Sequence, residues 1–333
     1  MLFFFLSIFA LAMAFTIVLE KFAYRLYLID YPIARSAHIS PKPSGGGLVV
    51  AVLFLFVSYV LEVNDYIYSN VFYALLAAAP VAAVGLFDDL SHVGLRVRLL
   101  IQFCASCWAL YFLGGIPPIE ISILQLSNTW VLSFLGIIAL VWLLNLYNFM
   151  DGIDGIAGTE VLFVSLMSSF FAIYEGDDTL ALLSATLFAT SAGFLVWNWP
   201  PSKLFMGDVG SSFIGFVLGI FALFSMHNEI MTVWTWFILL GVFVVDSTVT
   251  LSVRFATGKK WYEGHSCHAY QNAARKWGSH ERVVIFMLLI NLIWLAPLSW
   301  LSFLYPERGF YICLVALAPI VYLGRKLNAG LHD

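Results

Sequence analysis

The amino-acid sequence predicts an all-helical integral membrane protein, a polytopic bundle of about eleven transmembrane helices. The chain of 333 residues is 62% hydrophobic and only 11% charged, whereas a soluble domain carries about 25% charged residues. Its mean hydropathy is +0.92. Such a chain lacks the polar side chains that would cover a soluble surface. The composition therefore excludes a soluble enzyme, a coiled coil, a disordered chain and a disulfide-rich secreted scaffold.

Long apolar runs divide the whole chain, and each approaches the length of about 20 residues that a helix needs to cross a bilayer. They are continuous and lack the alternation of a membrane β-strand. The runs cover residues 1–19, 45–63, 70–87, 98–115, 130–148, 159–174, 179–197, 211–227, 233–253, 283–303 and 309–324. We expect a single transmembrane domain over residues 1–333, because too little chain remains for a separate soluble domain.

Positive charges indicate the orientation. All of the 16 lysines and arginines except Arg308 fall in or beside alternate loops. These loops cover residues 20–44, 88–97, 149–158, 198–210, 254–282 and 325–333. Because short cytoplasmic loops are rich in lysine and arginine, we expect the N-terminus outside and the C-terminus in the cytoplasm. No basic residue precedes the first run, unlike in a signal peptide, so we expect it to be a retained span.

Aspartates gather at the predicted cytoplasmic ends of the runs. Asp88 and Asp89 end the third run, Asp151 and Asp154 follow the fifth, and Asp208 precedes the eighth. Adjacent carboxylates repel one another and resist desolvation. A hard cation such as Mg²⁺, which is commonly held by one or two carboxylates plus substrate phosphates, offsets both penalties. For the adjacent pair alone, the alternative is a solvated acidic helix end.

The segment from Asn145 to Gly158 is more specific. Asn145, Asn148, Asp151 and Asp154 recur every three residues, and in a helix they would share one face. Amides and carboxylates suit a nucleotide base or sugar hydroxyls together with a metal, and the interspersed glycines let a backbone approach a ligand closely. The alternative is a glycine-rich turn with asparagine caps.

The segment that opens the eighth run, from Phe205 to Ser212, combines small residues with an acid. Asp208 is either the N-cap of this helix or the ligand of a metal that bridges a phosphate bound at the helix N-terminus. Phe205 either stacks on a base or anchors the chain at the membrane interface.

Two further loops carry candidate anion ligands. His265 and His268 stand near Lys259 and Lys260. Two histidines are too few for a structural zinc site, so phosphate oxygens are the expected partners. Lys42 precedes the glycine run 45–47, which predicts either phosphate contact through backbone N–H groups or a flexible hinge. The run lacks the Walker A spacing, which argues against an ATPase.

Asp246 is taken as the one acid well inside a span. A buried ionisable residue in a membrane is a functional candidate. The sequence leaves open whether Asp246 faces the cytoplasmic vestibule or makes a structural polar contact.

Taken together from about residue 30 to residue 272, these motifs resemble the polyprenyl-phosphate N-acetylhexosamine-1-phosphate transferases, the glycosyltransferase 4 family that includes the phospho-MurNAc-pentapeptide translocase. The resemblance implies transfer of N-acetylhexosamine 1-phosphate from a UDP-N-acetylhexosamine to undecaprenyl phosphate, with release of UMP. It implies Mg²⁺ as cofactor, with Mn²⁺ as the alternative. It also implies a bacterial inner (cytoplasmic) membrane protein with its active site on the cytoplasmic face and no nucleic-acid partner. Whether the protein is a monomer or a homodimer stays open.

The resemblance also implies roles for individual residues. Asp88 and Asp89 match the catalytic acidic pair, and Asp208 matches the metal ligand. The histidine motif for the pyrophosphate corresponds to His265 and His268. The positions that bind the nucleotide and sugar correspond to Lys42, Asn148, Asp151, Asp154 and Phe205.

Two departures from the family pattern bear on the sugar. His92 stands where a third Asp or Asn often follows the acidic pair, and the histidines at 265 and 268 are not contiguous. With Arg35-Ser-Ala-His38 before the glycine run, the chain looks closest to the branch that initiates O-antigen synthesis. The transferred sugar and the choice between one-step and two-step transfer stay open.

Two other functions compete with the transferase. A transporter or lipid flippase would place its polar groups near the membrane midplane, whereas these acids lie at one edge. A CDP-alcohol phosphatidyltransferase needs an arginine in its D-G-x-x-A-R motif, and Gly158 follows Ala157 at that place here.

Overall fold

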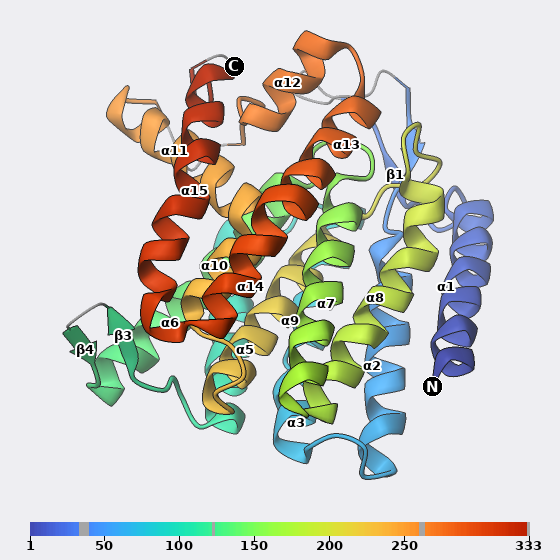
Figure 1. Ribbon diagram of the computed structural model, residues 1–333. Coiled ribbons are helices and arrows are strands. Elements are labelled where there is room, and N and C mark those ends of the chain that lie inside the picture. Colours follow the sequence, from blue (N-terminus) through green and yellow to red (C-terminus); the bar gives the residue numbers. More distant parts are fainter. Residues whose placement is uncertain (33–39, 122–123, 260–263, 332–333) are drawn as a thin grey trace.

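The computed structural model describes residues 1–32, 40–121, 124–259 and 264–331. The residues from Arg35 to His38, together with Lys260, lie outside this range. The described chain forms a helical bundle with two short antiparallel hairpins (Figure 1). The α-helices are α1 (Leu2–Phe22), α2 (Gly47–Val63), α3 (Ser69–Leu76), α4 (Ala78–Leu90), α5 (Leu95–Leu113), α6 (Thr129–Met150), α7 (Ile156–Glu175), α8 (Asp178–Asn198), α9 (Gly207–His227), α10 (Val233–Leu239), α11 (Gly241–Ala256), α12 (Ala269–Trp277), α13 (His280–Ile290), α14 (Ala296–Leu304) and α15 (Gly309–Lys326). The other elements are the π-helix η1 (Asn291–Leu295), the 3₁₀-helix η2 (Pro306–Arg308) and the strands β1 (Ile29–Asp30), β2 (Lys42–Pro43), β3 (Ile119–Ile121) and β4 (Leu124–Leu126).

The predicted fold class, a polytopic helical membrane protein, is confirmed. Among the described residues, nine helical segments are long and apolar enough to cross a membrane. The pair α10 and α11 makes a tenth, with an 83° bend between the two helices. The remaining apolar run, residues 45–63, corresponds to α2, which has only 17 residues. Each predicted run therefore corresponds to a helix or to consecutive helices, although nine or ten of them, rather than eleven, meet the length of a span.

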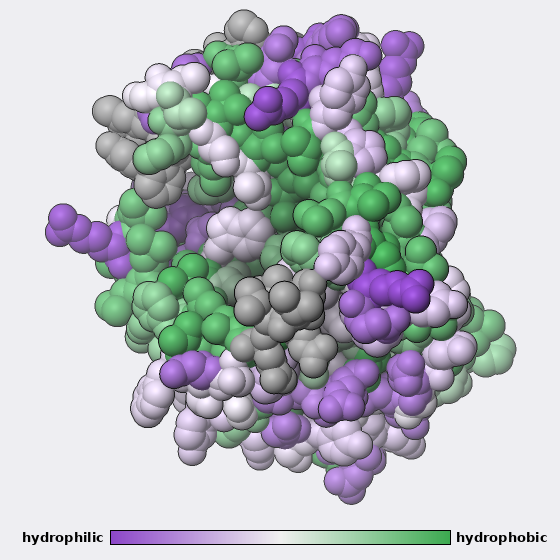
Figure 2. All heavy atoms as spheres, turned by 60° about the vertical axis from the view of Figure 1, so that its left-hand side comes forward, coloured by the Kyte–Doolittle hydropathy of each residue, from purple (hydrophilic) through white to green (hydrophobic). Residues whose placement is uncertain are grey.

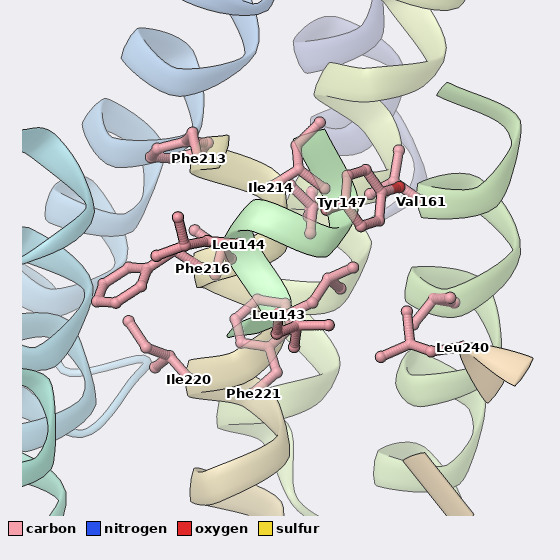
Figure 3. Packing of buried hydrophobic residues seen from close by; sticks show 14 of the residues in the cluster. Leu143, Leu144, Tyr147, Val161, Phe213, Ile214, Phe216, Ile220, Phe221 and Leu240 are labelled. Carbon is pink, nitrogen blue, oxygen red and sulfur yellow. The ribbon is translucent and has the colours of Figure 1, made fainter. Parts of the chain in front are cut away.

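Helix α9 forms the centre of the bundle. It packs against α2, α4 and α6, and 16 of its 21 residues are buried. Figure 3 shows Phe213, Phe216 and Phe221 of α9 in the same buried cluster as Leu144 of α6. With no Cβ atoms at their contact, two glycines let α2 approach α9: a Cβ on Gly47 would lie 2.1 Å from the Gly210 Cα. This close approach holds the start of α9 in place.

The surface agrees with a membrane-embedded bundle. On the face shown in Figure 2, hydrophobic side chains extend across the middle, and hydrophilic ones gather toward the upper and lower ends. Large apolar side chains such as Phe3 and Trp130 are exposed by 85% and 88%. Extensive exposed apolar surface marks a face that meets lipid or a partner.

Helix termini are set by local chemistry. Asn128 caps α6 by accepting hydrogen bonds from the N–H groups of Trp130 and Val131, both at 3.1 Å, and Asp177 caps α8 through Leu180 N–H at 2.7 Å. The other end of α7 stops at Gly176, whose φ of 78° is left-handed.

Candidate active site

The ends of α4, α6 and α9 meet beside the loop that joins α6 to α7. Asp89, at the end of α4, accepts hydrogen bonds from the backbone N–H of Asp208 (2.9 Å) and of Val209 (3.1 Å). A helix N-terminus has unpaired N–H groups and a positive partial charge, and the carboxylate satisfies both. Asp89 therefore caps α9 from a neighbouring helix. The alternative in which Asp208 is the N-cap is wrong, because α9 begins at Gly207 and Asp208 lies in its first turn.

Arg98 joins two of the predicted site residues. Its guanidinium contacts the Asp88 carboxylate through Nη1 and lies 3.2 Å from Asp208 Oδ2 through Nη2. The other oxygen of Asp88 accepts a hydrogen bond from Val93 N–H at 2.7 Å. The adjacent acids thus have separate surroundings: Asp88 faces the arginine, and Asp89 faces the amides of α9.

Asn148 connects α6 with α9. Its side-chain amide donates to Asp208 Oδ1 at 2.8 Å and to Ser211 Oγ at 2.9 Å. Asp208 is therefore held by an amide on one oxygen and by Arg98 on the other. Such flanking donors fix the orientation of a carboxylate, which a metal ligand needs.

The regular spacing of the two asparagines and two aspartates does not place them on one helix face. Helix α6 ends at Met150, so Asp151 and Asp154 lie in the following loop. Asn145 lies on α6 but pairs with Gln102 of α5, to whose Oε1 it donates at 2.8 Å. The prediction that the four residues share one helix face is therefore wrong. Asn145 instead joins α6 to α5.

Asp151 carries a poorly compensated negative charge. Within the described part of the chain, no hydrogen bond or ion pair reaches its carboxylate. Its burial, followed by the negative charges of Asp208, Asp89 and Asp154, raises its pKa well above the usual range. A cation beside these groups would favour the ionised carboxylate.

This acidic cluster fits a divalent cation that also binds substrate. Among the described residues, no three His, Cys, Asp or Glu side chains are grouped to hold a metal by themselves. Mg²⁺ commonly takes one or two carboxylates and completes its shell with water and substrate phosphates. Asp151 and Asp208 are the two carboxylates that suit this arrangement, because one is unpaired and the other is oriented by Asn148.

Asp154 occupies a different, well-compensated position. It is 7% exposed and accepts hydrogen bonds from Ser202 N–H (3.1 Å) and Ser202 Oγ (2.8 Å). His280 Nδ1 lies 3.3 Å and Lys42 Nζ 3.8 Å from Asp154 Oδ2. Burial alone would raise the pKa of Asp154, but the hydrogen bonds of His280 and Ser202 and the charge of Lys42 lower it to about 2.

The nucleotide-side candidates Lys42 and Phe205 lie together. Lys42 Nζ is 5.1 Å from the centre of the Phe205 ring, and it donates to Ser202 Oγ at 3.3 Å. Their backbones are also linked, because Phe205 N–H donates to the Pro43 carbonyl at 2.9 Å. A cation next to an aromatic face and a carboxylate is a suitable surface for a polar, planar ligand.

Asp154 gives the protein a measurable acid sensitivity. Because folding lowers its pKa from 3.8 to about 2, its stabilising contribution is complete above pH 3.8 and disappears as the pH falls through about 2. We expect Asp154→Asn to be less stable than the wild type above this window and equally stable below it. Thermal unfolding in detergent across the acid range measures the difference. Ser202→Ala should move the loss to higher pH, and a difference independent of pH would contradict the assignment.

The role of Asp246, left open by the sequence, is resolved by its contacts. Its two oxygens accept hydrogen bonds from the N–H groups of Ala269 (2.8 Å) and Tyr270 (2.9 Å). Asp246 of α11 therefore caps α12. Tyr270 in turn donates to the Phe149 carbonyl at 3.0 Å, and a Cβ on Gly152 would lie 2.2 Å from its hydroxyl. Asp246 thus supports the α6–α7 loop through α12.

The two predicted pyrophosphate ligands differ in exposure. His268 is 1% exposed, with Nδ1 3.4 Å from Asp246 Oδ1. His265 is partly exposed, and its ring centre lies 4.9 Å from that of His268. Both stand immediately before α12 in chain order. Their pyrophosphate role stays a prediction, and His265 is the more accessible of the pair.

The glycine run packs against the start of α9. Gly46 N–H and Gly47 N–H donate to the carbonyls of Phe205 and Met206, both at 2.8 Å. These two N–H groups already have partners, so neither of the alternatives, a phosphate-binding backbone or a flexible hinge, describes them. The glycines instead allow the backbone of residues 46–47 to lie against residues 205–206.

Three residues that contact or support the site were missed by sequence reasoning. In the sequence, Arg98 indicates only the orientation of the chain, because no motif links it to Asp88, ten residues before it. His280 begins α13 and gives no motif with Asp154. Glu160 lies buried within α7, so the interpretation of Asp246 as the one acid inside a span is wrong.

Comparisons with known proteins agree with this geometry. Residues 71–226 match the family model described as glycosyl transferase family 4. The chain is 26% identical over 313 residues to the undecaprenyl-phosphate alpha-N-acetylglucosaminyl 1-phosphate transferase of Thermotoga maritima, covering 93% of this chain and 94% of that protein. It is 26% identical to the decaprenyl-phosphate N-acetylglucosaminephosphotransferase of Mycobacterium leprae, covering 80% and 75%.

A third relative has a different named substrate. The phospho-N-acetylmuramoyl-pentapeptide-transferase of Caldicellulosiruptor bescii is 26% identical over 278 residues, covering 79% of this chain and 84% of that protein. Residues 71–226, which match the family model, contain the acidic pair of α4, the α6–α7 loop and the start of α9. The resemblance to glycosyl transferase family 4 that its motifs predict is thus confirmed over residues 71–226.

Proposed function

We propose that the protein transfers N-acetylhexosamine 1-phosphate from a UDP-sugar to a polyprenyl phosphate and releases UMP. One observation carries the proposal: Asp88, Asp151 and Asp208, from three separate segments, gather at one end of a membrane bundle beside Arg98. This arrangement suits two phosphate substrates and a cation. The names of the Thermotoga and Mycobacterium relatives support a polyprenyl phosphate as acceptor.

The distribution of basic residues supports a cytoplasmic position for this site in a bacterial inner membrane. Lys42 of β2, Arg98 in the first turn of α5 and Lys203 before α9 lie at this end of the bundle, and the positive-inside rule assigns such basic segments to the cytoplasm. UDP-sugars are charged and water-soluble, so a site at this edge receives them from the aqueous side. The polyprenyl chain of the acceptor remains in the bilayer.

A divalent cation completes the proposed site. Mg²⁺, or Mn²⁺ as the alternative, would be held by Asp151 and Asp208 and would supply positive charge next to the diphosphate of the donor. Asn148 keeps the carboxylate of Asp208 oriented. Arg98 neutralises Asp88 and the second oxygen of Asp208, which lowers the repulsion that an incoming phosphate meets.

We infer direct transfer in one step. A phosphomonoester has a second pKa of about 6, so the acceptor is mostly a dianion at neutral pH and needs no strong general base. One of its oxygens attacks the β-phosphorus, a new P–O bond forms, and the bond to the bridging oxygen breaks so that UMP leaves with both electrons. Asp89 caps α9 and Asp88 pairs with Arg98, so neither carboxylate is unpaired as a nucleophile. Isolation of a phosphorylated enzyme that passes its phosphosugar to lipid would contradict this mechanism.

The remaining predicted residues divide between the two substrates. Lys42, Phe205 and Asp154 lie together and are proposed to bind the nucleotide. His265 is proposed to contact the pyrophosphate, with His268 behind it. The nucleotide would thus lie toward Phe205 and the reacting phosphates toward Asp208.

The donor sugar is proposed from the relatives' names. Two of them specify N-acetylglucosamine and the third N-acetylmuramoyl-pentapeptide. We propose UDP-N-acetylglucosamine as the first donor to test, with UDP-N-acetylated deoxyhexosamines next. Initiation of O-antigen is the pathway suggested by the departures in the histidine and acidic motifs.

Release of UMP tests the proposed function. Purified protein, undecaprenyl phosphate, Mg²⁺ and each UDP-N-acetylhexosamine are combined, and UMP is measured by chromatography. We expect UMP only when donor, acceptor and divalent cation are all present. Absence of UMP with every donor, from protein that melts cooperatively, would refute the transferase and favour a transporter or flippase.

A further inference from the structure

A buried carboxyl group inside α7 takes no part in the mechanism above. Glu160 lies about one turn into the helix that follows the Asp151 loop, and its side chain is fully buried. Asn291 donates from Nδ2 to Glu160 Oε2 at 2.6 Å. Among the described residues no lysine, arginine or histidine pairs with it. An ionised carboxylate without a countercharge is costly in a membrane interior.

One atom of each side chain in this pair lacks a hydrogen-bond partner, and a single proton would let the two atoms bond to one another. Glu160 Oε1 and Asn291 Oδ1 are both buried and unpartnered. Both are acceptors while the carboxylate is ionised, whereas buried polar atoms are normally satisfied. One proton on Oε1 converts it into a donor, and Asn291 Oδ1 is the acceptor on the group already bound to Glu160. The same proton removes the uncompensated charge.

We propose that Glu160 is a protonated carboxylic acid that forms a ring of two hydrogen bonds with Asn291 and so fixes α7 against the junction of α13 and η1. Tyr147 of α6 is a titratable group near Glu160, and its hydroxyl already donates to the Ala157 carbonyl at 2.7 Å. Figure 3 shows the Tyr147 ring beside Val161 of α7. The proton therefore belongs to the Glu160–Asn291 pair.

The position of Asn291 indicates what the pair holds in place. Asn291 is the first residue of the π-helix η1, which interrupts the helix between α13 and α14. π-helical turns are rare and are often found at functional sites. At its other end α13 presents His280 to Asp154. The two ends of α13 thus contact the α6–α7 region, through His280 at one end and through Asn291 just beyond the other. Glu160 and Asn291 are therefore positioning residues for the loop that carries Asp151.

Glu160→Gln separates this proposal from a role for an ionised glutamate. Glutamine reproduces both hydrogen bonds without a titrating proton, because its amide donates to Asn291 Oδ1 and its carbonyl accepts from Asn291 Nδ2. We expect Glu160→Gln to retain the wild-type melting temperature and turnover. Glu160→Ala should lower the melting temperature by several degrees and turnover by about tenfold, the equivalent of one lost buried hydrogen bond.

Infrared difference spectroscopy observes the proton directly. At neutral pH the difference between the wild-type and Glu160→Gln spectra should contain the carbonyl stretch of one protonated carboxylic acid. The matched control is Glu175→Gln at the exposed end of the same helix, which should retain the band. If Glu160→Gln leaves the carboxylic band unchanged, or is as inactive as Glu160→Ala, the proposal is wrong.

The turnover measurements rest on the proposed function, whereas the spectra and melting temperatures do not. Failure of the wild type to release UMP would therefore refute the transferase while leaving the spectroscopic result decisive for the Glu160–Asn291 pair.

Discussion

Asp208→Asn is expected to lower turnover by about a thousandfold, the effect of removing one well-placed electrostatic group from an active site. Asparagine keeps the size of the side chain and an oxygen that accepts from Asn148. It loses the charge that pairs with Arg98 at 3.2 Å and that is proposed to hold the cation. UMP release at increasing Mg²⁺ measures the effect. The variant should bind donor with little dependence on Mg²⁺.

The matched control for this variant is Asp246→Asn. Asp246 is also a buried acid whose carboxylate meets a helix N-terminus, but its contacts are with α12 and not with Asp208. Asparagine retains one acceptor for the N–H groups of α12, so turnover should fall by about tenfold at most. Full activity of Asp208→Asn would remove it from the proposed metal site. A loss in Asp246→Asn equal to that in Asp208→Asn would place Asp246 in the site.

Asp89→Ala is expected to lower both the stability and the turnover of the protein. The substitution leaves Asp208 N–H and Val209 N–H without their acceptors. Loss of a helix cap costs about 0.5–2 kcal/mol in the free energy of unfolding, and the first turn of α9 carries Asp208. Chemical or thermal unfolding in detergent and UMP release, measured on the same preparation, record the two effects.

Asp89→Asn distinguishes this capping role from a nucleophilic one. Asparagine keeps one acceptor for the amides of α9 but cannot form an acyl phosphate intermediate. We expect stability and turnover between those of Asp89→Ala and the wild type. If Asp89→Asn is as stable as the wild type yet as inactive as Asp89→Ala, the carboxylate of Asp89 takes part in the chemistry and the two-step mechanism is favoured.

The parts of the fold that depend on local composition were predictable from the sequence. Each apolar run corresponds to helix, because burial of backbone polar groups in lipid demands it. The ends of α4, α6 and α9 also meet, as the gathering of aspartates predicts. The length of α2 was not predictable, because its start at Gly47 depends on a contact with Gly210 in a distant helix.

The individual partners of the site acids required the packed structure. The adjacency of Asp88 and Asp89 predicts a shared role, but their side chains leave the helix in different directions and meet Arg98 and the amides of α9. The three-residue spacing after Asn145 was interpreted as helical, but α6 ends before Asp151. Such long-range contacts leave no periodic signal in the sequence.

The fate of the β-phosphorus tests the central claim most directly. UDP-N-acetylglucosamine labelled at the β-phosphorus and, separately, in the uridine is incubated with the protein, undecaprenyl phosphate and Mg²⁺. Transfer of a sugar phosphate predicts that the β-phosphorus label moves to the lipid and that the uridine label appears in UMP. Recovery of both labels in UDP, or of the β-phosphorus label in no lipid product, would contradict the account.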